Sequence, residues 1–287
     1  MSAQVKAGRS RSRLRLLTIA GSDSGGGAGI QGDLKTFAAF GAYGMSALTA
    51  VTAQNTRGVI GLKLLPPALV AAQIEAVATD IGVDGTKTGM LGSAAIVRAV
   101  ARSVRLHRLK PLVIDPVLVA TSGDPLWVAG AINSLRRNLF PLATLLTPNL
   151  IEAEVLTGRR VRSAPAAVDA ARRLHQKWGV PVLVKGGHLP GPPVDVLVDA
   201  SGVTRFVGRR RGRGRIHGAG CALSAAITAR LAAGRPLVDA IAEAKGYLER
   251  ALAAAPALGA GASPPDHLWW TPREGARGLL RPSRCSS

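Results

Sequence analysis

Aromatic residues are scarce in this chain: tryptophan, tyrosine and phenylalanine make up only 3% of its 287 residues. Proteins that bind single-stranded nucleic acid usually stack bases on aromatic side chains. The formal net charge of +20, carried largely by arginine, would otherwise suit such a partner. The arginine clusters are spread over the whole chain, and aromatic residues do not alternate with them. We therefore do not expect nucleic acid to be the partner.

Cysteine is also rare, which excludes a disulfide framework. The chain has 2 cysteines, Cys221 and Cys285, and they lie far apart. No apolar run reaches the length of about 20 residues that spans a bilayer. The basic start, residues 1–15, is not followed by the apolar core of a secretory signal. These absences predict a cytoplasmic protein with no membrane partner.

Hydrophobic residues, by contrast, make up 47% of the chain, which is enough for one large core. Strand-like apolar runs alternate with stretches of helical spacing. Strands are expected at residues 15–20, 46–53, 85–89, 112–115, 145–148, 180–185, 194–198 and 203–207. Helices are expected at residues 30–40, 67–79, 94–104, 129–140, 150–156, 166–178, 220–233 and 237–255.

This alternation predicts an α/β fold in which helices cover both faces of a mostly parallel sheet. One domain is expected over residues 15–270. The basic ends, residues 1–14 and 271–287, are expected to be disordered. Ligands of such sheets bind beyond the carboxyl ends of the strands, and the polar and glycine-rich segments of this chain follow its expected strands.

A glycine pattern after the first strand resembles a dinucleotide-binding turn. Gly27, Gly29 and Gly32 have the required spacing. A dinucleotide site also needs an acidic residue at the end of the next strand, and residues 47–55 contain none. The lysine motif of a phosphate-binding P-loop is absent as well. A nucleotide, if bound, must therefore be held by a different loop.

Asp33 and Gln54 are polar residues expected near strand–helix junctions among apolar neighbours. They could recognise a small polar ring, because a buried polar ligand needs hydrogen-bond partners. They could equally be a first-turn helix acid and a loop amide. From the residues alone, both readings stay open.

Three further strand ends carry polar residues that suit phosphates. Asn149 and Glu152 share a helix face and could hold a hydrated Mg²⁺, or they could be a helix cap and its first-turn acid. Lys185 precedes two glycines and could reach a nucleotide phosphate. Asp115 begins another polar loop. This arrangement predicts a phosphate-handling edge of the sheet.

The segment from His217 to Cys221 is a glycine turn that leads directly into an apolar helix. The N–H groups and dipole of a helix N-terminus favour an anion. The same field would stabilise a thiolate, so Cys221 is a candidate base. A plain packing loop, with His217 in a structural role, is the alternative.

Together these segments resemble the hydroxymethylpyrimidine/phosphomethylpyrimidine kinases of thiamine biosynthesis. The resemblance rests on eight motifs in order, which extend over most of the chain. They are Thr18–Phe37, Gly41–Ser46, Thr52–Thr56, Lys87–Gly92, Asp115–Asp124, Thr147–Ala153, Val184–His188 and His217–Cys221.

The resemblance implies a ribokinase-like three-layer α/β/α fold and ATP-dependent phosphorylation of a pyrimidine alcohol. A second phosphorylation, of the monophosphate to the diphosphate, is also implied. The implied cofactors are ATP and Mg²⁺, the implied partners are the pyrimidine and ATP, and we expect a homodimer. The implied site residues follow in three groups. Those for the pyrimidine are Asp33, Gln54, Met90, Val117 and Gly21. Those for the nucleotide and metal are Lys185, Asn149, His217, Glu152 and Asp115. Those for phosphoryl transfer are Gly218, Ala219, Gly220 and Cys221.

The chain departs from the family pattern at three places. Ala219 stands where the family usually has threonine, and Thr88 where a small apolar residue is common. Residues 209–215 are arginine-rich where the family usually has Asp-Thr-x-Asn-Thr at the nucleotide. This last departure bears on ATP affinity, although arginines could contact phosphates directly. Two alternatives therefore stay open: a pyridoxal kinase of the same fold and a non-catalytic pyrimidine-binding regulator.

Overall fold

The computed structural model describes residues 13–118, 130–187, 189, 191–210 and 216–271. In this part of the chain, a single 9-stranded sheet has the order β3-β2-β1-β4-β5-β6-β7-β8-β9. Its strands are β1 (Arg15–Ser22), β2 (Tyr43–Gln54), β3 (Val59–Leu64), β4 (Gly85–Thr88), β5 (Leu112–Ile114), β6 (Leu145–Leu146), β7 (Val182–Val184), β8 (Val194–Asp199) and β9 (Gly202–Val207). From β2 to β7 neighbouring strands are parallel, whereas β3, β8 and β9 are antiparallel to their neighbours. The mostly parallel sheet is therefore confirmed.

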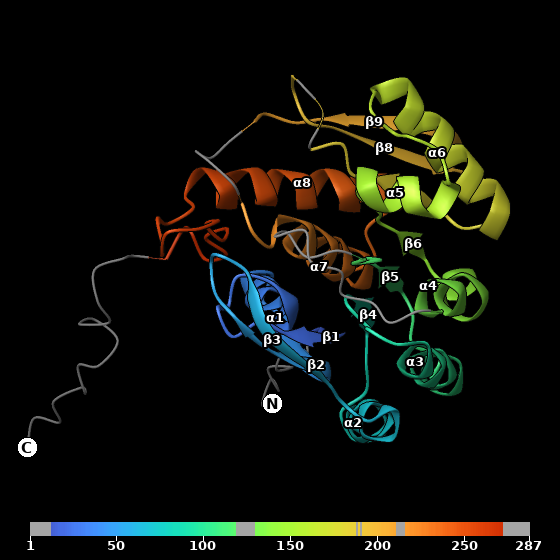
Figure 1. Cartoon of the computed structure of the whole chain (residues 1–287), viewed down its shortest axis with the longest axis vertical. Coiled ribbons are helices and arrows are strands. Elements are labelled where there is room, and N and C mark those ends of the chain that lie inside the picture. The colour runs from blue at the N-terminus through green and yellow to red at the C-terminus, as the bar shows by residue number, and fades with distance from the viewer. Residues whose placement is uncertain (1–12, 119–129, 188, 190, 211–215, 272–287) are drawn as a thin grey trace, which may run out of the picture.

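Helices cover both faces of this sheet (Figure 1). One face carries α1 (Gly29–Ala39), α7 (Ala219–Ala232) and α8 (Leu237–Ala253). The other carries α2 (Pro67–Asp80), α3 (Ala94–Leu106), α4 (Ala131–Ser134), α5 (Leu150–Thr157) and α6 (Ala164–Trp178). Side chains alternate along the strands, so Val113 packs with the α7 layer while its neighbours Leu112 and Ile114 pack with the α3 layer. The three-layer α/β/α architecture is confirmed.

Two elements differ from the sequence-based expectation. Strand β3 was not expected, because its residues are largely exposed and show no alternation of buried and exposed positions. The helix expected over residues 129–140 is irregular: α4 passes into a π-helical turn, Leu135–Leu139, and then into a 3₁₀ turn, Phe140–Leu142. Pro141 lies in that last turn and has no N–H to continue an α-helix. The expectations for residues 1–12 and 272–287 lie outside the described residues.

The segment after α8 returns to the end of the sheet where the central strands finish. The Ala262 N–H donates to the Thr56 carbonyl, and the His217 N–H donates to the Ser263 carbonyl at 3.0 Å. His267, only 4% exposed, places its Nδ1 3.1 Å from Thr36 Oγ1 of α1. This segment therefore ties α1, α8 and the loop before α7 together. Within the described residues, no helix combines the length and apolar character needed to cross a membrane.

His267 generates a prediction about stability and pH. Burial lowers the pKa of His267 to about 4, against 6.5 in the unfolded chain. Between these values the unfolded chain binds a proton that the folded chain does not, so stability falls as the pH drops from 6.5 toward 4. Asparagine keeps a donor near the Nδ1 position but does not titrate in this range. We therefore expect His267→Asn to lose roughly 2–3 kcal/mol less free energy of unfolding than the wild type when the pH is lowered. Urea unfolding at pH 7 and at pH 4.5 measures it. Equal pH dependence in both proteins would contradict the prediction.

Candidate active site

The sequence-predicted polar residues gather at one edge of the sheet, because the parallel strands all end there. Gln54 ends β2, Asp115 follows β5, Asn149 follows β6 and Lys185 follows β7. Helices α1 and α7 begin at the same edge, after their glycine-rich turns. The loops and helix starts of this edge form the candidate active site.

The first turn of α7 has the backbone geometry expected of an anion-binding helix start. Its N-cap, Gly218, has a φ of 85°, and no side chain caps the helix or places an acid in its first turn. A Cβ at Gly218 would lie 1.9 Å from the carbonyl oxygen of Gly27, so only glycine fits. The two glycine turns are therefore in direct contact. The backbone of Gly218, Ala219 and Gly220 thus has the helix-start geometry that suits a phosphate.

Lys185 and Asp115 form an ion pair beside this turn. Lys185 Nζ lies 2.6 Å from Asp115 Oδ1, and the two side chains are 12% and 2% exposed. The Ser224 hydroxyl of α7 donates to Asp115 Oδ2. A Cβ on Gly220 would lie 3.2 Å from Lys185 Nζ, so the ammonium group sits directly against the α7 turn. A charge in this position can meet a phosphate bound at the turn.

Asn149 and Glu152 form a capping box at the start of α5. Asn149 Oδ1 accepts from the Glu152 N–H at 2.9 Å, and Glu152 Oε2 accepts from the Asn149 N–H at 2.7 Å. The capping alternative is therefore confirmed for both residues. Burial raises the pKa of Glu152 to about 7; Lys185 opposes this shift and Asp115 adds to it.

Asp33 lies in the interior rather than on the site surface. Its carboxylate and the ammonium of Lys87 are both 0% exposed and 2.8 Å apart, and the Thr18 hydroxyl donates to the same carboxylate at 2.6 Å. Burial raises the pKa of Asp33, and Lys87 and Thr18 act against that shift. Burial also acts against the charged form of Lys87, but Asp33, Cys221 and Asp115 outweigh it and raise the pKa of Lys87. This ion pair, whose charges cancel, lies in the core below the candidate site.

Gln54 lies with His217 and with Asp23, a residue that the sequence analysis did not single out. His217 Nε2 is 2.9 Å from Asp23 Oδ2 and 3.1 Å from Gln54 Nε2. His217 was expected at the nucleotide, but its ring instead meets the predicted pyrimidine contact. Asp23 could have been suspected from sequence, since an aspartate before a glycine run often accepts from the backbone N–H groups that follow.

The predicted apolar walls lie at the same edge. Met90 is 8% exposed, and its Cε would be only 2.8 Å from a Cβ on Gly21, so this glycine makes room for the methionine. Val117, half-buried, follows Asp115 and donates its N–H to the Asp115 carbonyl. The ends of two motifs, residues 119–124 and 188, lie outside the described residues.

Cys221 lies in the first turn of α7, close to the expected helix start, but its thiol is not activated. Burial raises its pKa to about 11, although Lys87 and the Gly29 N–H favour the thiolate. The expectation that the helix start stabilises a thiolate is therefore wrong. Desolvation outweighs the helix dipole.

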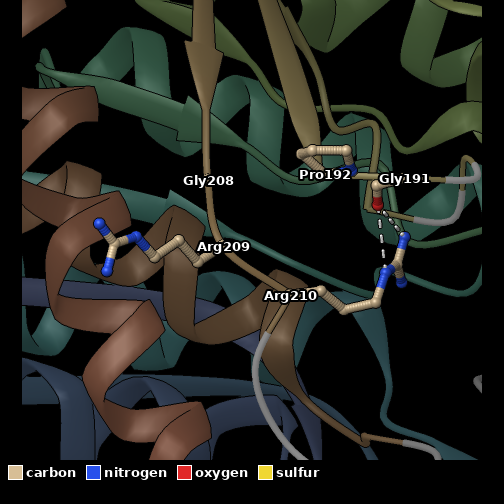
Figure 2. A pocket seen from close by; sticks show the side chains of 5 residues that line it. All are labelled: Gly191, Pro192, Gly208, Arg209 and Arg210. Atoms are coloured by element: carbon tan, nitrogen blue, oxygen red, sulfur yellow. Dashed lines mark hydrogen bonds between the residues drawn. The ribbon is translucent and has the colours of Figure 1, made fainter.

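The arginine-rich segment is described only as far as Arg210. A pocket of about 580 Å³ is lined by Gly191, Pro192, Gly208, Arg209 and Arg210, whose side chains are drawn in Figure 2. The Arg210 guanidinium donates to the Leu189 carbonyl at 2.6 Å and to the Gly191 carbonyl at 3.0 Å, and also to the Gly187 carbonyl. Arg210 therefore clamps the loop after β7, and its donors are engaged by backbone rather than presented to a phosphate.

Comparisons with known proteins show the family of the chain. The family model described as phosphomethylpyrimidine kinase matches residues 23–266. A Mycobacterium tuberculosis protein named hydroxymethylpyrimidine/phosphomethylpyrimidine kinase is 48% identical over 258 residues, covering 89% of this chain and 94% of its own. A thiamine biosynthesis bifunctional protein of Geobacter sulfurreducens is 50% identical over 254 residues, or 88% of this chain; the match spans 52% of that longer protein.

Solved structures give the same picture. An ADP complex of Bacillus subtilis pyridoxal kinase superposes with a TM-score of 0.83 at 37% identity, covering 89% of this chain and 98% of that one. A phosphomethylpyrimidine kinase from Clostridium difficile 630 has a TM-score of 0.73 at 41% identity, covering 82% of this chain and 98% of that one. Both share the ribokinase-like fold.

The buried ion pair generates a stability prediction. Lys87→Met would leave the Asp33 carboxylate buried without its counter-ion, so we expect a loss of about 3–5 kcal/mol in the free energy of unfolding. The double variant Lys87→Met/Asp33→Leu removes both charges and should lose clearly less. Urea unfolding of the three proteins measures this. A double variant as unstable as the single one would show that charge is not the cause.

The Cys221 thiol generates a prediction about reactivity. In a Cys285→Ser background, we expect iodoacetamide to label Cys221 at pH 8 at least about a hundredfold more slowly than a cysteine peptide, because only the thiolate reacts. The rate should keep rising with pH toward about 11. A plateau below pH 8 would mean that the helix start activates the thiol after all.

Proposed function

Because the chain belongs to the phosphomethylpyrimidine kinase family, we propose that it uses ATP to phosphorylate 4-amino-5-hydroxymethyl-2-methylpyrimidine. The monophosphate is then phosphorylated to the diphosphate, and both steps serve thiamine biosynthesis. The family match over residues 23–266 and relatives near half identity support this substrate. Pyridoxal is the second candidate, supported by the structural likeness to pyridoxal kinases at lower identity.

One observation carries the proposal: the turn that leads into α7 contacts Lys185 on one side and the side-chain amide of Gln54 on the other. Gly220 lies against Lys185, and His217 lies against Gln54. A phosphoryl group bound at this helix start would therefore lie between a cation that meets nucleotide phosphates and an amide that orients the acceptor. Phosphoryl transfer needs mainly such positioning and charge neutralisation.

On the acceptor side, Gln54 would hold the aminopyrimidine, with Met90, Val117 and Gly21 as its walls. Asp33 already accepts from Lys87 and Thr18, so it would meet the ring only through the lone pair left on Oδ1. This limited access makes Gln54 the main source of ring recognition.

On the donor side, Lys185 and Asn149 would meet the nucleotide, and the N–H groups of the α7 turn would stabilise the transferring phosphoryl group. Cys221 would accept the proton of the hydroxymethyl group. Its thiol is protonated at neutral pH, so it can act as a base only if bound substrates lower its pKa. Because the transition state of phosphoryl transfer demands little from a base, the turn can contribute most of the rate.

The carboxylates of Asp115 and Glu152 fit a Mg²⁺ ion brought in with ATP. No cluster of three or more His, Cys, Asp or Glu side chains within the described ranges could hold a metal by itself. Mg²⁺ suits such a site, since it usually takes one or two carboxylates together with phosphates and water. The unfavourable interaction between buried Glu152 and Asp115 is one that a divalent cation would relieve. The ion would neutralise phosphate charge there.

We also propose a cytoplasmic homodimer. The edge strand β3 supports self-association, because it exposes Ile60 and Leu62 together with an unpaired strand edge. The low cysteine content supports a reducing compartment.

The test is phosphate transfer from ATP·Mg²⁺ to each candidate alcohol. We expect turnover of the hydroxymethylpyrimidine to exceed that of pyridoxal. Lys185→Met should reduce kcat by about a hundredfold or more, because a charge on the phosphates is lost. Lys177→Met removes an exposed lysine that lies over Trp178, and should leave kcat unchanged.

Circular dichroism of Lys185→Met checks that the variant folds. Faster turnover of pyridoxal would favour the second candidate. Binding of the pyrimidine without any transfer would favour a regulator.

A further inference from the structure

The Asp23 carboxylate, in the glycine-rich turn before α1, accepts several hydrogen bonds. It is 3% exposed. Its Oδ1 accepts from the Gly25 N–H at 2.8 Å, and its Oδ2 accepts from the N–H groups of Gly27 and Ala28 at 3.1 and 2.9 Å. Burial opposes the charge, but His217 and these N–H groups outweigh it and lower the pKa of Asp23. The carboxylate therefore fixes the path of this turn.

The same oxygen reaches across to the second glycine turn. His217 Nε2 lies 2.9 Å from Asp23 Oδ2. Because a carboxylate can only accept, this contact places a proton on Nε2 of the imidazole. His217 immediately precedes Gly218, whose Cα has no room for a substituent against the Gly27 carbonyl. One carboxylate thus holds both turns in register where they touch.

The contact also determines how Gln54 is oriented. The Thr52 hydroxyl has one proton, and its 2.7 Å contact with the Ser22 carbonyl uses it. Its 3.2 Å contact with the Gln54 side chain therefore needs the amide NH₂ group as donor. The atom that lies 3.1 Å from His217 Nε2 is then the amide oxygen rather than the nitrogen, and it shares the single Nε2–H proton with Asp23 Oδ2 in a three-centre hydrogen bond. Both neighbours select the same orientation of an amide whose two ends only hydrogen bonds distinguish.

From these contacts we infer that Asp23 is a positioning residue for phosphoryl transfer. Through His217 it sets the orientation of Gln54, and through Gly27, Ala28 and His217 it holds the α7 anion hole against the first glycine turn. The inference rests on the proposed function for its kinetic part only. The structural part, that one carboxylate locks two distant turns together, is independent of the substrate.

The structural part is tested by amide hydrogen exchange on the ligand-free protein. Asp23→Asn keeps the shape of the side chain but removes its charge and one acceptor oxygen. We expect exchange about tenfold faster or more in both segments, residues 23–31 and residues 216–222. Faster exchange in the first segment alone would overturn the lock.

Asp84→Asn is the matched control. Asp84 also accepts from a backbone N–H and pairs with a cation, but both belong to Arg15 at the opposite edge of the sheet. It should leave exchange in both segments unchanged. If Asp84→Asn also speeds exchange in both segments, the cause is general destabilisation, and the inference that Asp23 holds the two turns together is wrong.

The kinetic part is tested with the pyrimidine. Asp23→Asn should lower kcat by about a hundredfold and weaken pyrimidine binding by about tenfold, with less than about a threefold change in the KM for ATP. In the double variant with Gln54→Ala, binding should weaken no further than in Gln54→Ala alone, because Asp23 acts on the ring through Gln54. Additive losses, or an equal loss of ATP affinity, would overturn the inference. If the wild-type protein neither binds nor phosphorylates the pyrimidine, the proposed function is wrong instead. The hydrogen-exchange result would still decide whether Asp23 holds the two turns together.

Discussion

Two lysines, Lys87 fully buried and Lys185 nearly so, lie beneath the first turn of α7, each paired with its own carboxylate. Lys87 is paired with Asp33, and Lys185 with Asp115. Each pair is close to neutral, so a preference of the site for anions would come from the backbone N–H groups above the pairs. The burial of these four charges is tolerated only because each is matched at hydrogen-bonding distance. The proposed anion hole lies above these matched charges.

The fold explains why these groups meet. Parallel strands bring residues from β1, β4, β5 and β7 to one edge, and the crossover helices place the α1 and α7 starts at the same edge. Glycine then decides how closely the parts approach. At Gly218 the neighbouring carbonyl occupies the space of a side chain, and at Gly186 a Cβ would lie 2.0 Å from the Val194 carbonyl oxygen. The close approach of these backbone segments therefore depends on the absence of side chains at both glycines.

Much of this arrangement could be predicted from sequence. The periodic apolar runs predicted every strand that is buried, and the order of motifs placed Gln54, Lys185 and the α7 turn at one edge. Strand β3 was not predicted because an exposed edge strand has no buried face, so its sequence need not alternate between apolar and polar residues. Spacing alone could not decide between a cap and a ligand for Asn149 and Glu152. The protonation of Cys221 could not be predicted either, since its desolvation depends on the packing of α7 against β1 and β4, which are far away in sequence.

The contact between the two glycine turns has a consequence for how the protein becomes active during synthesis. One turn is made near the start of the chain, while the other, and the segment around Ser263 and His267 that backs it, come near its end. Contacts between such distant segments close slowly and late, because a long loop must be ordered before they form. A growing chain can therefore build the central strands long before the proposed anion hole is complete. Catalytic competence arrives only after α7 and α8 have left the ribosome.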